Sequence, residues 1–444
     1  MNKIINTNST KAHEFIKKVT IGDGYNMIFD HKKSKGFYLV DSISKKKYLD
    51  MFSFYASYPI SYNHPSISNK QFKKYIGEIA IHNPSNSDIY TLEYAKFLST
   101  FNNVCMNNVF NKAFLISGGA LAVENALKVA FDWKIKSNKL NGITFNNTHN
   151  KVIHFKEAFH GRSGYTLSLT NTDAIKYMNF PLFNNWPRIL NPKIEFPITQ
   201  YNIDDLQIRE NMALRKIEYI LQKHNAEISC IILEPIQGEG GDNHFRASFW
   251  NELRSLANKY NVLLIADEIQ SGVGLTGKMW AYEHYGGVPD ILVFGKKMQV
   301  CGFMCTDRIN KFGIGLDSNR INSTWGGNLV DMVRSNKFLE IIDNDKLVDN
   351  AHVVGTYILQ LLGELQKEYP NLCYNIRGKG LMIAFDLPNC LIRDKVIELA
   401  FKKQMLLLPC GNNSIRLRPF LDFDLKHAEL FIKILNECLY EIKK

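Results

Sequence analysis

Three short stretches of the chain carry residues suited to chemistry, and each follows an apolar run. Gly118, Gly119 and Ala120 precede a helical pattern, where small residues let the backbone approach a phosphate and a helix N-terminus supplies free N–H groups. Asp267 ends another apolar run, and a buried carboxylate is costly unless it is paired or functional. Lys297 ends a Gly-Lys-Lys sequence, where burial and nearby positive charge would lower its pKa and make it nucleophilic.

Each of these features has a simpler structural explanation when it is taken alone. A Gly-Gly turn before a helix is more often only a turn, a carboxylate can cap a helix or form a buried ion pair, and two lysines can lie in an exposed loop. Together the features supply a phosphate cradle, an acidic partner for a pyridinium nitrogen and an amine for an aldehyde. These are the three contacts that pyridoxal 5'-phosphate requires, so the chain order predicts a site for this cofactor.

Two further segments add candidate residues to the same site. In the sequence Phe159-His160-Gly161-Arg162, the aromatic ring could stack on a cofactor ring and the arginine could bind a carboxylate. The glycine-rich segment 234–241 brings a second carboxylate, Glu239, near the site. A core phenylalanine and a solvated glutamate are the structural alternatives.

The elements that must position these residues alternate along the middle of the chain. From about residue 110, helical patterns separate runs that are apolar on both faces, as in strands of a buried parallel sheet. This alternation predicts a doubly wound α/β domain, in which ligands bind outside the carboxyl ends of the strands. The predicted strands are 112–117, 151–155, 228–233, 262–266 and 291–294.

Chain length and pattern predict two domains and an N-terminal segment. The chain has 444 residues, more than one compact core of typical size contains. We expect residues 61–325 to form the large cofactor-binding domain and residues 326–444 to form a smaller α+β domain. Residues 1–60 are expected to pack with the smaller domain.

The net charge of +11 offers an alternative class of function, a basic protein that binds nucleic acid. Lys and Arg are spread along the chain, however, and the densest run is only Lys45-Lys46-Lys47. A nucleic-acid-binding surface needs basic residues concentrated on one element. The alternative predicts a colourless protein with salt-dependent retention on nucleic acid.

The eight cysteines include no Cys-X-X-Cys pair, which favours buried thiols in a reducing compartment over disulfides or a metal site. Cys301 and Cys305 are four residues apart, which suits one face of a helix, but no further metal ligands follow nearby. The polar N-terminus lacks a secretory apolar region, and the chain has no apolar stretch of about 18 residues. We therefore expect a cytoplasmic protein with no metal, membrane or nucleic-acid partner.

Over nearly its whole length, the sequence resembles the class III aminotransferases of fold type I. Within this class it is most similar to the lysine 6-aminotransferases, chiefly at 120–134, 295–302 and 323–334. The resemblance implies a large, doubly wound, mostly parallel sheet domain with a smaller α+β domain. The segments that carry the resemblance are 117–134, 157–172, 234–245, 266–281, 294–302, 323–334 and 415–419.

The resemblance also implies a reaction. The ε-amino group of L-lysine passes to 2-oxoglutarate through a Schiff base of pyridoxal phosphate, and the products are 2-aminoadipate 6-semialdehyde and L-glutamate. The alternative within the class is another ω-aminotransferase, with 4-aminobutyrate or ornithine as the amino donor.

Roles in cofactor binding follow from the same resemblance. Lys297 rather than Lys296 forms the Schiff base, because three residues separate the reactive lysine from a small pair, here Cys301-Gly302. Asp267 pairs with the pyridine nitrogen. The other implied contacts are the phosphate turn of Gly118, Gly119 and Ala120, the stacked ring of Phe159, Gln270 near the ring hydroxyl, and Thr324, which reaches the phosphate of the other subunit of a homodimer.

Substrate roles fall on two arginines and one glutamate. Arg162 binds the carboxylate distant from the reacting carbon, Arg416 binds the α-carboxylate of glutamate or 2-oxoglutarate, and Glu239 pairs with Arg416 when no such carboxylate is present. The chain departs from many class members in its Gly-Gly phosphate turn, which fits the lysine enzymes. It also departs at Pro419-Phe420, where many members have Pro-Pro.

Overall fold

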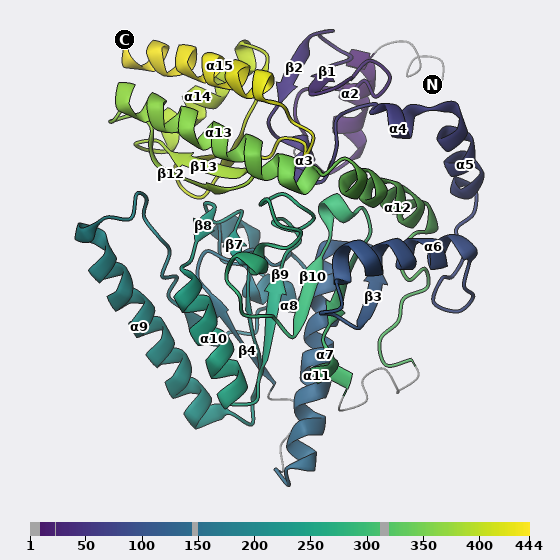
Figure 1. Ribbon diagram of the computed structural model, residues 1–444, viewed down its shortest axis with the longest axis vertical. Coiled ribbons are helices and arrows are strands. Elements are labelled where there is room, and N and C mark those ends of the chain that lie inside the picture. The colour runs from purple at the N-terminus through teal and green to yellow at the C-terminus, as the bar shows by residue number, and fades with distance from the viewer. Residues whose placement is uncertain (1–8, 23, 144–149, 311–318) are drawn as a thin grey trace.

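The largest element of the fold is a seven-stranded sheet in the order β3-β11-β10-β9-β6-β4-β5, around which the helices are arranged in Figure 1. The computed structural model describes residues 9–22, 24–143, 150–310 and 319–444. The strands of the sheet are β3 (Lys112–Ile116), β4 (Lys151–Phe155), β5 (Arg188–Ile189), β6 (Ile228–Leu233), β9 (Leu263–Asp267), β10 (Ile291–Phe294) and β11 (Cys301–Cys305).

Every strand pairing in this sheet is parallel except the two that β11 makes with β10 and β3. The predicted α/β class with a mostly parallel sheet is therefore confirmed. All five predicted strands are present, and their ends differ from the prediction by at most one residue. Strand β9 extends through Asp267 itself, so this carboxylate lies at the carboxyl end of the sheet.

Strand β11 corrects the interpretation of the two nearby cysteines as one face of a helix. Cys301 and Cys305 are the first and last residues of an extended strand. A spacing of four residues places side chains on one face of both a helix and a strand, so the spacing alone could not distinguish them. The close pairing with β3 explains Gly302, because a Cβ atom there would lie 2.1 Å from the carbonyl oxygen of Phe114.

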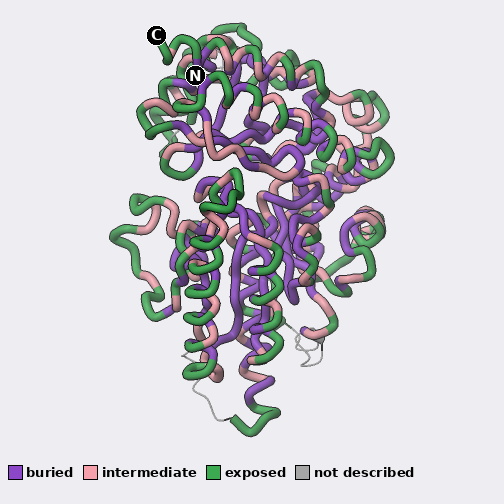
Figure 2. Tube along the Cα trace, turned by 60° about the vertical axis from the view of Figure 1, so that its left-hand side comes forward, coloured by how far each residue is buried: buried purple, intermediate pink, exposed green. Residues whose placement is uncertain are grey.

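Helices cover both faces of the sheet, because alternate strand residues point to opposite sides. Leu263 and Ile265 pack in one apolar cluster with Val123 of α7 (Gly119–Leu140), whereas Leu264 packs in the other cluster with α10 (Ala247–Lys259). Figure 2 shows buried residues at the centre and many exposed residues on the surrounding helices.

The C-terminal part of the chain forms a second, four-stranded antiparallel sheet in the order β12-β13-β16-β15, called the C-terminal sheet below. Two long helices, α12 and α13, precede this sheet in the chain. The elements of this part are α12 (Leu329–Asn344), α13 (Leu347–Glu368), β12 (Tyr374–Lys379), β13 (Met382–Asp386), α14 (Cys390–Lys402), β14 (Met405–Leu406), β15 (Leu408–Cys410), β16 (Ser414–Leu417) and α15 (Leu425–Lys443).

The N-terminal segment joins this C-terminal part through a third sheet. Strand β2 (Lys47–Asp50) pairs with β1 (Tyr38–Val40) on one side and with β14 on the other. In Figure 1 the purple N-terminal strands lie beside the yellow-green C-terminal helices. This pairing supports the expected packing of residues 1–60 with the smaller domain, while the domain boundaries stay a prediction.

The remaining elements are short, with the exception of α9. In the part of the chain that the structure describes, no helix combines the length and the apolar character needed to cross a membrane. The elements are α2 (Ser9–Val19), α3 (Ser53–Ala56), α4 (Pro65–Ser68), α5 (Lys70–Ala80), α6 (Leu92–Phe101), η1 (Asn102–Met106), α8 (Gly164–Leu169), η3 (Ala174–Lys176), α9 (Gln200–His224), β7 (Ile236–Gln237), β8 (Asn243–His244), η4 (Ala281–His284), η5 (Lys296–Met298) and α11 (Asp307–Asn310).

Candidate active site

A cavity of about 240 Å³ lies at the carboxyl ends of the parallel strands. Loops that follow four strands and the N-terminus of α7 contribute to its wall, as the α/β topology predicts. Five residues singled out from the sequence lie on this wall: Gly119, Ala120, Phe159, Asp267 and Gln270.

The glycine turn before α7 is built for close approach of a ligand. Gly118 has a φ of 104° and is the N-cap of α7, without a side-chain cap. This φ favours glycine, and the absence of a capping side chain leaves the first N–H groups of the helix available to an anion. A Cβ atom at Gly119 would lie 3.1 Å from the Cδ1 atom of Ile269. The turn therefore fits a phosphate group, as expected from the sequence.

Asp267 is held by His160, a residue to which the sequence analysis assigned no role. The Nδ1 atom of His160 lies 2.8 Å from Oδ2 of Asp267, and the backbone N–H of Ile269 donates to Oδ1 at 3.2 Å. Both side chains are buried, and the Nε2 atom of His160 has no partner among the described residues. The histidine fixes the orientation of the carboxylate on the cavity wall. Its position inside the Phe-His-Gly-Arg motif was the available signal.

The two adjacent lysines of η5 point in different directions. Lys296 lies on the cavity wall, whereas Lys297 is buried and its Nζ atom donates to the carbonyl oxygen of Ala56 at 2.9 Å. Burial and the charges of Arg416 and Arg418 lower the pKa of Lys296 to about 7. Burial, Arg418 and Lys296 hold the pKa of Lys297 well below its usual value.

Glu239 and Arg416 form the ion pair that the resemblance implied. Oε2 of Glu239 lies 2.6 Å from the guanidinium of Arg416, whose side chain is almost fully buried. Arg416 also donates to Oε1 of Gln270 at 3.2 Å, and Arg418 donates to the same oxygen at 2.8 Å. Gln270 thus lies on the cavity wall, and its side-chain oxygen accepts hydrogen bonds from two arginines.

A second cation on Glu239, Lys176, was missed by the sequence analysis. Its Nζ atom lies 2.8 Å from Oε1 of Glu239 and 3.1 Å from Oγ1 of Thr172. Burial alone would raise the pKa of Glu239, but Arg416 and Lys176 together lower it to about 2. No motif marked this lysine, because it lies in a polar segment far from Glu239 in the sequence.

Glu234 holds two segments of the site together, and it was also missed. Its two carboxylate oxygens accept hydrogen bonds from the backbone N–H of Phe159 at 2.9 Å and of Gly238 at 3.0 Å. Burial raises the pKa of this carboxyl to about 7. Glu234 therefore ties the loop that carries the cavity's aromatic ring to the loop that carries Glu239.

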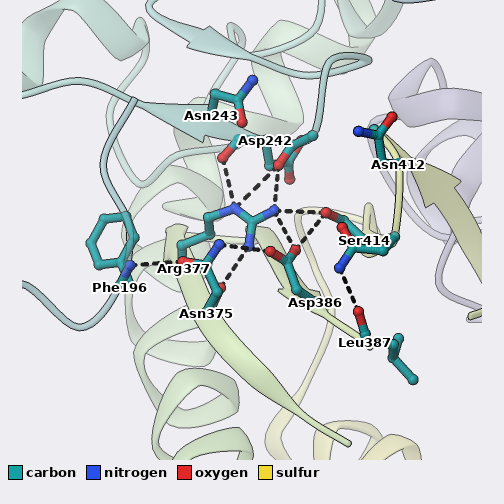
Figure 3. A network of polar contacts seen from close by, with 12 residues as sticks. Phe196, Asp242, Asn243, Asn375, Arg377, Asp386, Leu387, Asn412 and Ser414 are labelled. Carbon is teal, nitrogen blue, oxygen red and sulfur yellow. Dashed lines mark hydrogen bonds and ion pairs between the residues drawn. The ribbon is translucent and has the colours of Figure 1, made fainter. Parts of the chain in front are cut away.

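The loop that carries Glu239 is also anchored to the C-terminal sheet, as Figure 3 shows. Arg377 of β12 donates from Nε to the carbonyl oxygens of Gly241 and Asp242, each at 3.1 Å, and forms an ion pair with Asp386 at 2.8 Å. The carboxylate of Asp242 pairs with Arg418, and both of these side chains are fully buried. The position of Glu239 thus depends on contacts between two parts of the fold.

The other residues singled out from the sequence do not line the cavity, and these are Gly118, Arg162, Glu239, Lys297, Thr324 and Arg416. Arg162 is exposed, with its guanidinium carbon 5.9 Å from the centroid of the Phe159 ring. Thr324 is exposed in a loop that Asn86 holds through hydrogen bonds to the carbonyl oxygens of Trp325 and Gly327.

Comparison with known proteins gives the family of the chain. Residues 20–439 match the family model described as aminotransferase class III. The chain is 44% identical to an L-lysine-epsilon aminotransferase of Amycolatopsis lactamdurans, with 92% of this chain and 91% of the relative aligned. It is 41% identical to the enzyme of the same name from Streptomyces clavuligerus, over 94% of this chain and 91% of the relative.

A solved structure agrees in fold over the same length. The lysine aminotransferase from M. tuberculosis superposes with a TM-score of 0.95 at 40% identity, and the match covers 98% of this chain and 100% of that chain. The glycine turn, the strand-end aspartate and the paired lysines therefore lie in an aminotransferase framework, and the chain belongs to the class III aminotransferase family.

Proposed function

We propose that this protein is a pyridoxal-phosphate-dependent lysine 6-aminotransferase. It transfers the ε-amino group of L-lysine to 2-oxoglutarate and gives 2-aminoadipate 6-semialdehyde and L-glutamate. The observation that carries the proposal is the ion pair of Glu239 and Arg416, which a hydrogen bond from Arg416 connects to Gln270 on the cavity wall. The similarity to L-lysine-epsilon aminotransferases supports it.

The residues on the cavity wall and at the turn before α7 fit the cofactor. Gly118 and Gly119 suit the phosphate, Asp267 suits the pyridine nitrogen, and the ring of Phe159 suits stacking. When bound, pyridoxal phosphate supplies the electron sink for proton removal at the carbon that bears the amine. Lys297 holds the cofactor aldehyde, an assignment supported by its burial, its lowered pKa and its spacing from Cys301-Gly302.

Lys297 also moves the proton during the reaction. A neutral lysine can accept a proton from carbon, and burial, the main cause of the lowered pKa of this side chain, favours the neutral form. Lys296 is the competing assignment, because it lies on the cavity wall.

The ion pair lets one site accept two kinds of substrate. L-lysine reacts at its far end and brings no carboxylate near the reacting carbon, so Arg416 needs Glu239 as its partner. Glutamate and 2-oxoglutarate bring an α-carboxylate, which takes the place of Glu239 on Arg416. Arg162 binds the distant carboxylate in both cases.

A homodimer completes the site in this proposal, with Thr324 binding the phosphate of the other subunit. Thr324 is exposed in the single chain, and large apolar side chains lie exposed around the loop that anchors it. Exposed apolar patches of this kind mark interaction surfaces. The exposed side chains are Ile89, Tyr90, Leu92 and Trp325. A cytoplasmic location stays a prediction.

The deciding experiment is the absorbance spectrum of the purified protein before and after addition of L-lysine without a keto acid. A band near the edge of the visible range that L-lysine shifts to shorter wavelength supports both the cofactor and the amino donor. A band that only 4-aminobutyrate or ornithine shifts keeps the class and replaces the substrate. The absence of a band after addition of pyridoxal phosphate contradicts the proposal.

A further inference from the structure

The carboxylate of Glu239 is bound by two cations, one on each oxygen. Arg416 binds Oε2 at 2.6 Å and Lys176 binds Oε1 at 2.8 Å. Because the two contacts use different oxygens, the carboxylate can leave one cation and keep the other.

The two cations belong to different parts of the fold. Arg416 lies on β16 of the C-terminal sheet and its side chain is only 2% exposed, whereas Lys176 ends η3 in the segment after α8 and its side chain is 11% exposed. Thr172 holds the Lys176 Nζ atom at 3.1 Å, and the ring centroid of Phe159 lies 5.4 Å from it. Lys176 is therefore the outer partner of Glu239 and Arg416 the inner one.

We propose that Lys176 is the outer anchor of Glu239 and a specificity-determining residue for the keto-acid half of the reaction. This inference rests on the function proposed above. When an α-carboxylate binds Arg416, Glu239 must leave Arg416, and its charge then needs another cation. Lys176 is already in contact with Glu239 and supplies that cation. We call the arrangement in which Glu239 binds Arg416 the inner arrangement, and the one in which Glu239 has left Arg416 the displaced arrangement. The displaced arrangement therefore keeps one ion pair.

The energetic consequence differs between the two half-reactions. A ligand shifts an equilibrium between two arrangements only through its different interaction with each of them. Lys176→Met removes one contact of Glu239 in both arrangements. In the inner arrangement Glu239 keeps Arg416, whereas in the displaced arrangement it has no cation left, and a part-buried carboxylate without a counter-ion is the costlier state. Loss of a charge-assisted hydrogen bond of this kind weakens binding roughly tenfold. Ligands that carry an α-carboxylate should therefore bind about tenfold more weakly to Lys176→Met, and ligands without one should bind as before.

Two unreactive ligands separate these cases in the cofactor-loaded protein. Glutarate has a carboxylate at each end and requires a free Arg416, whereas hexanoate has one carboxylate and an apolar end. Calorimetry should give a Kd for glutarate that is about tenfold higher in Lys176→Met, with an unchanged Kd for hexanoate. In steady-state assays the KM for 2-oxoglutarate should rise by a similar factor, while kcat and the KM for L-lysine stay the same. Lys176→Arg should restore the glutarate affinity.

A matched control removes a different lysine–carboxylate pair, one that does not include Glu239. Lys193 lies 2.8 Å from Glu157, so Lys193→Met removes a similar pair without touching Glu239. An equal loss of glutarate affinity in Lys193→Met, or an equal loss for glutarate and hexanoate in Lys176→Met, overturns the inference.

A double-mutant cycle then tests whether Lys176 acts through Glu239. In the Glu239→Gln background, Lys176→Met should have no further effect on glutarate binding. Additive effects would show that Lys176 contacts the ligand directly and would overturn the inference. A wild-type protein in which L-lysine shifts no absorbance band refutes the proposed function and the inference with it. A wild-type protein that responds to L-lysine, with glutarate affinity unchanged in Lys176→Met, refutes the inference alone.

Discussion

The carboxylate of Glu239 lies 2.6 Å from the guanidinium of Arg416, a residue 177 positions away in the sequence. The contact joins the loop between β7 and β8 to strand β16 of the C-terminal sheet. Burial would by itself lower the pKa of Arg416, but nearby acidic groups, Glu239 among them, raise it. The ion pair therefore keeps Arg416 charged, and Glu239 occupies its guanidinium when the bound ligand has no α-carboxylate.

Replacement of Glu239 by Ala should reduce the specificity of the protein for L-lysine more than it weakens the binding of glutamate. The change leaves Arg416 without its carboxylate, so the arginine attracts any α-carboxylate. When L-lysine binds with its amine end at the reacting position, Arg416 stays unpaired, which disfavours this binding mode. We expect kcat/KM for L-lysine to fall roughly tenfold or more, and the Kd for glutamate to change less. Single-turnover absorbance changes with each donor measure both effects. Equal losses in the two half-reactions would contradict the role of Glu239.

Replacement of Lys297 by Ala should abolish the lysine-dependent absorbance change and lower turnover by about 10²–10⁴-fold, the usual contribution of a positioned proton-transfer group. Lys296→Ala, the neighbouring control, should keep the visible band. Borohydride reduction followed by peptide mass spectrometry identifies the lysine that carries the cofactor. Retention of the band in Lys297→Ala would move the assignment to Lys296, which lies on the cavity wall.

Lys296 should make the cofactor-free protein more stable as the pH rises from about 7 to 10.5. Its pKa is about 7 in the folded chain, against an ordinary value of 10.5. Between these values the unfolded chain binds more protons than the folded chain, so the free energy of unfolding increases with pH. Lys296→Met should reduce this slope, as measured by thermal unfolding across the range. Replacement of the exposed Lys74 should leave the slope unchanged, and an unchanged slope in Lys296→Met would refute the prediction.

The fully buried pair of Asp242 and Arg418 should dominate the stability of the loop that carries Glu239. Asp242→Asn leaves the buried charge of Arg418 without a counter-ion, which costs about 3–5 kcal/mol. Chemical denaturation followed by tryptophan fluorescence measures the loss. The control is Asp205→Asn, which removes an exposed partner of Arg209 and should cost at most about 1 kcal/mol. Similar losses in the free energy of unfolding in both variants would show that burial does not increase the cost of breaking the ion pair.

Thr324 should act across a dimer interface. In a hybrid dimer of a Lys297→Ala subunit with a Thr324→Asp subunit, one site combines an intact Lys297 with an intact Thr324 from the neighbouring subunit. Tagged co-expression should give such hybrids about half the wild-type activity, because one of the two sites in a twofold dimer is complete. If Thr324 served its own subunit, neither site would be intact and the hybrid would be inactive.

Much of this framework could be predicted from the sequence because it depends on local patterns. Runs such as Ile228–Leu233 are apolar on both faces, and this local property marks a buried parallel strand wherever it occurs. The positive φ of Gly118 and the place of Asp267 at the end of β9 follow from residue type and chain order. The class of fold and the glycine turn, carboxylate and lysines were therefore determined by the sequence itself.

The tertiary structure decided which side chains meet. The contact of Lys176 with Glu239, the bond of His160 to Asp267 and the direction of Lys296 into the cavity depend on packing between segments far apart in the chain. Strand β11 shows the same limit, because a spacing of four residues suits a helix and a strand equally. Local patterns define which elements form, but the distances between side chains on different elements are set only when those elements pack against one another.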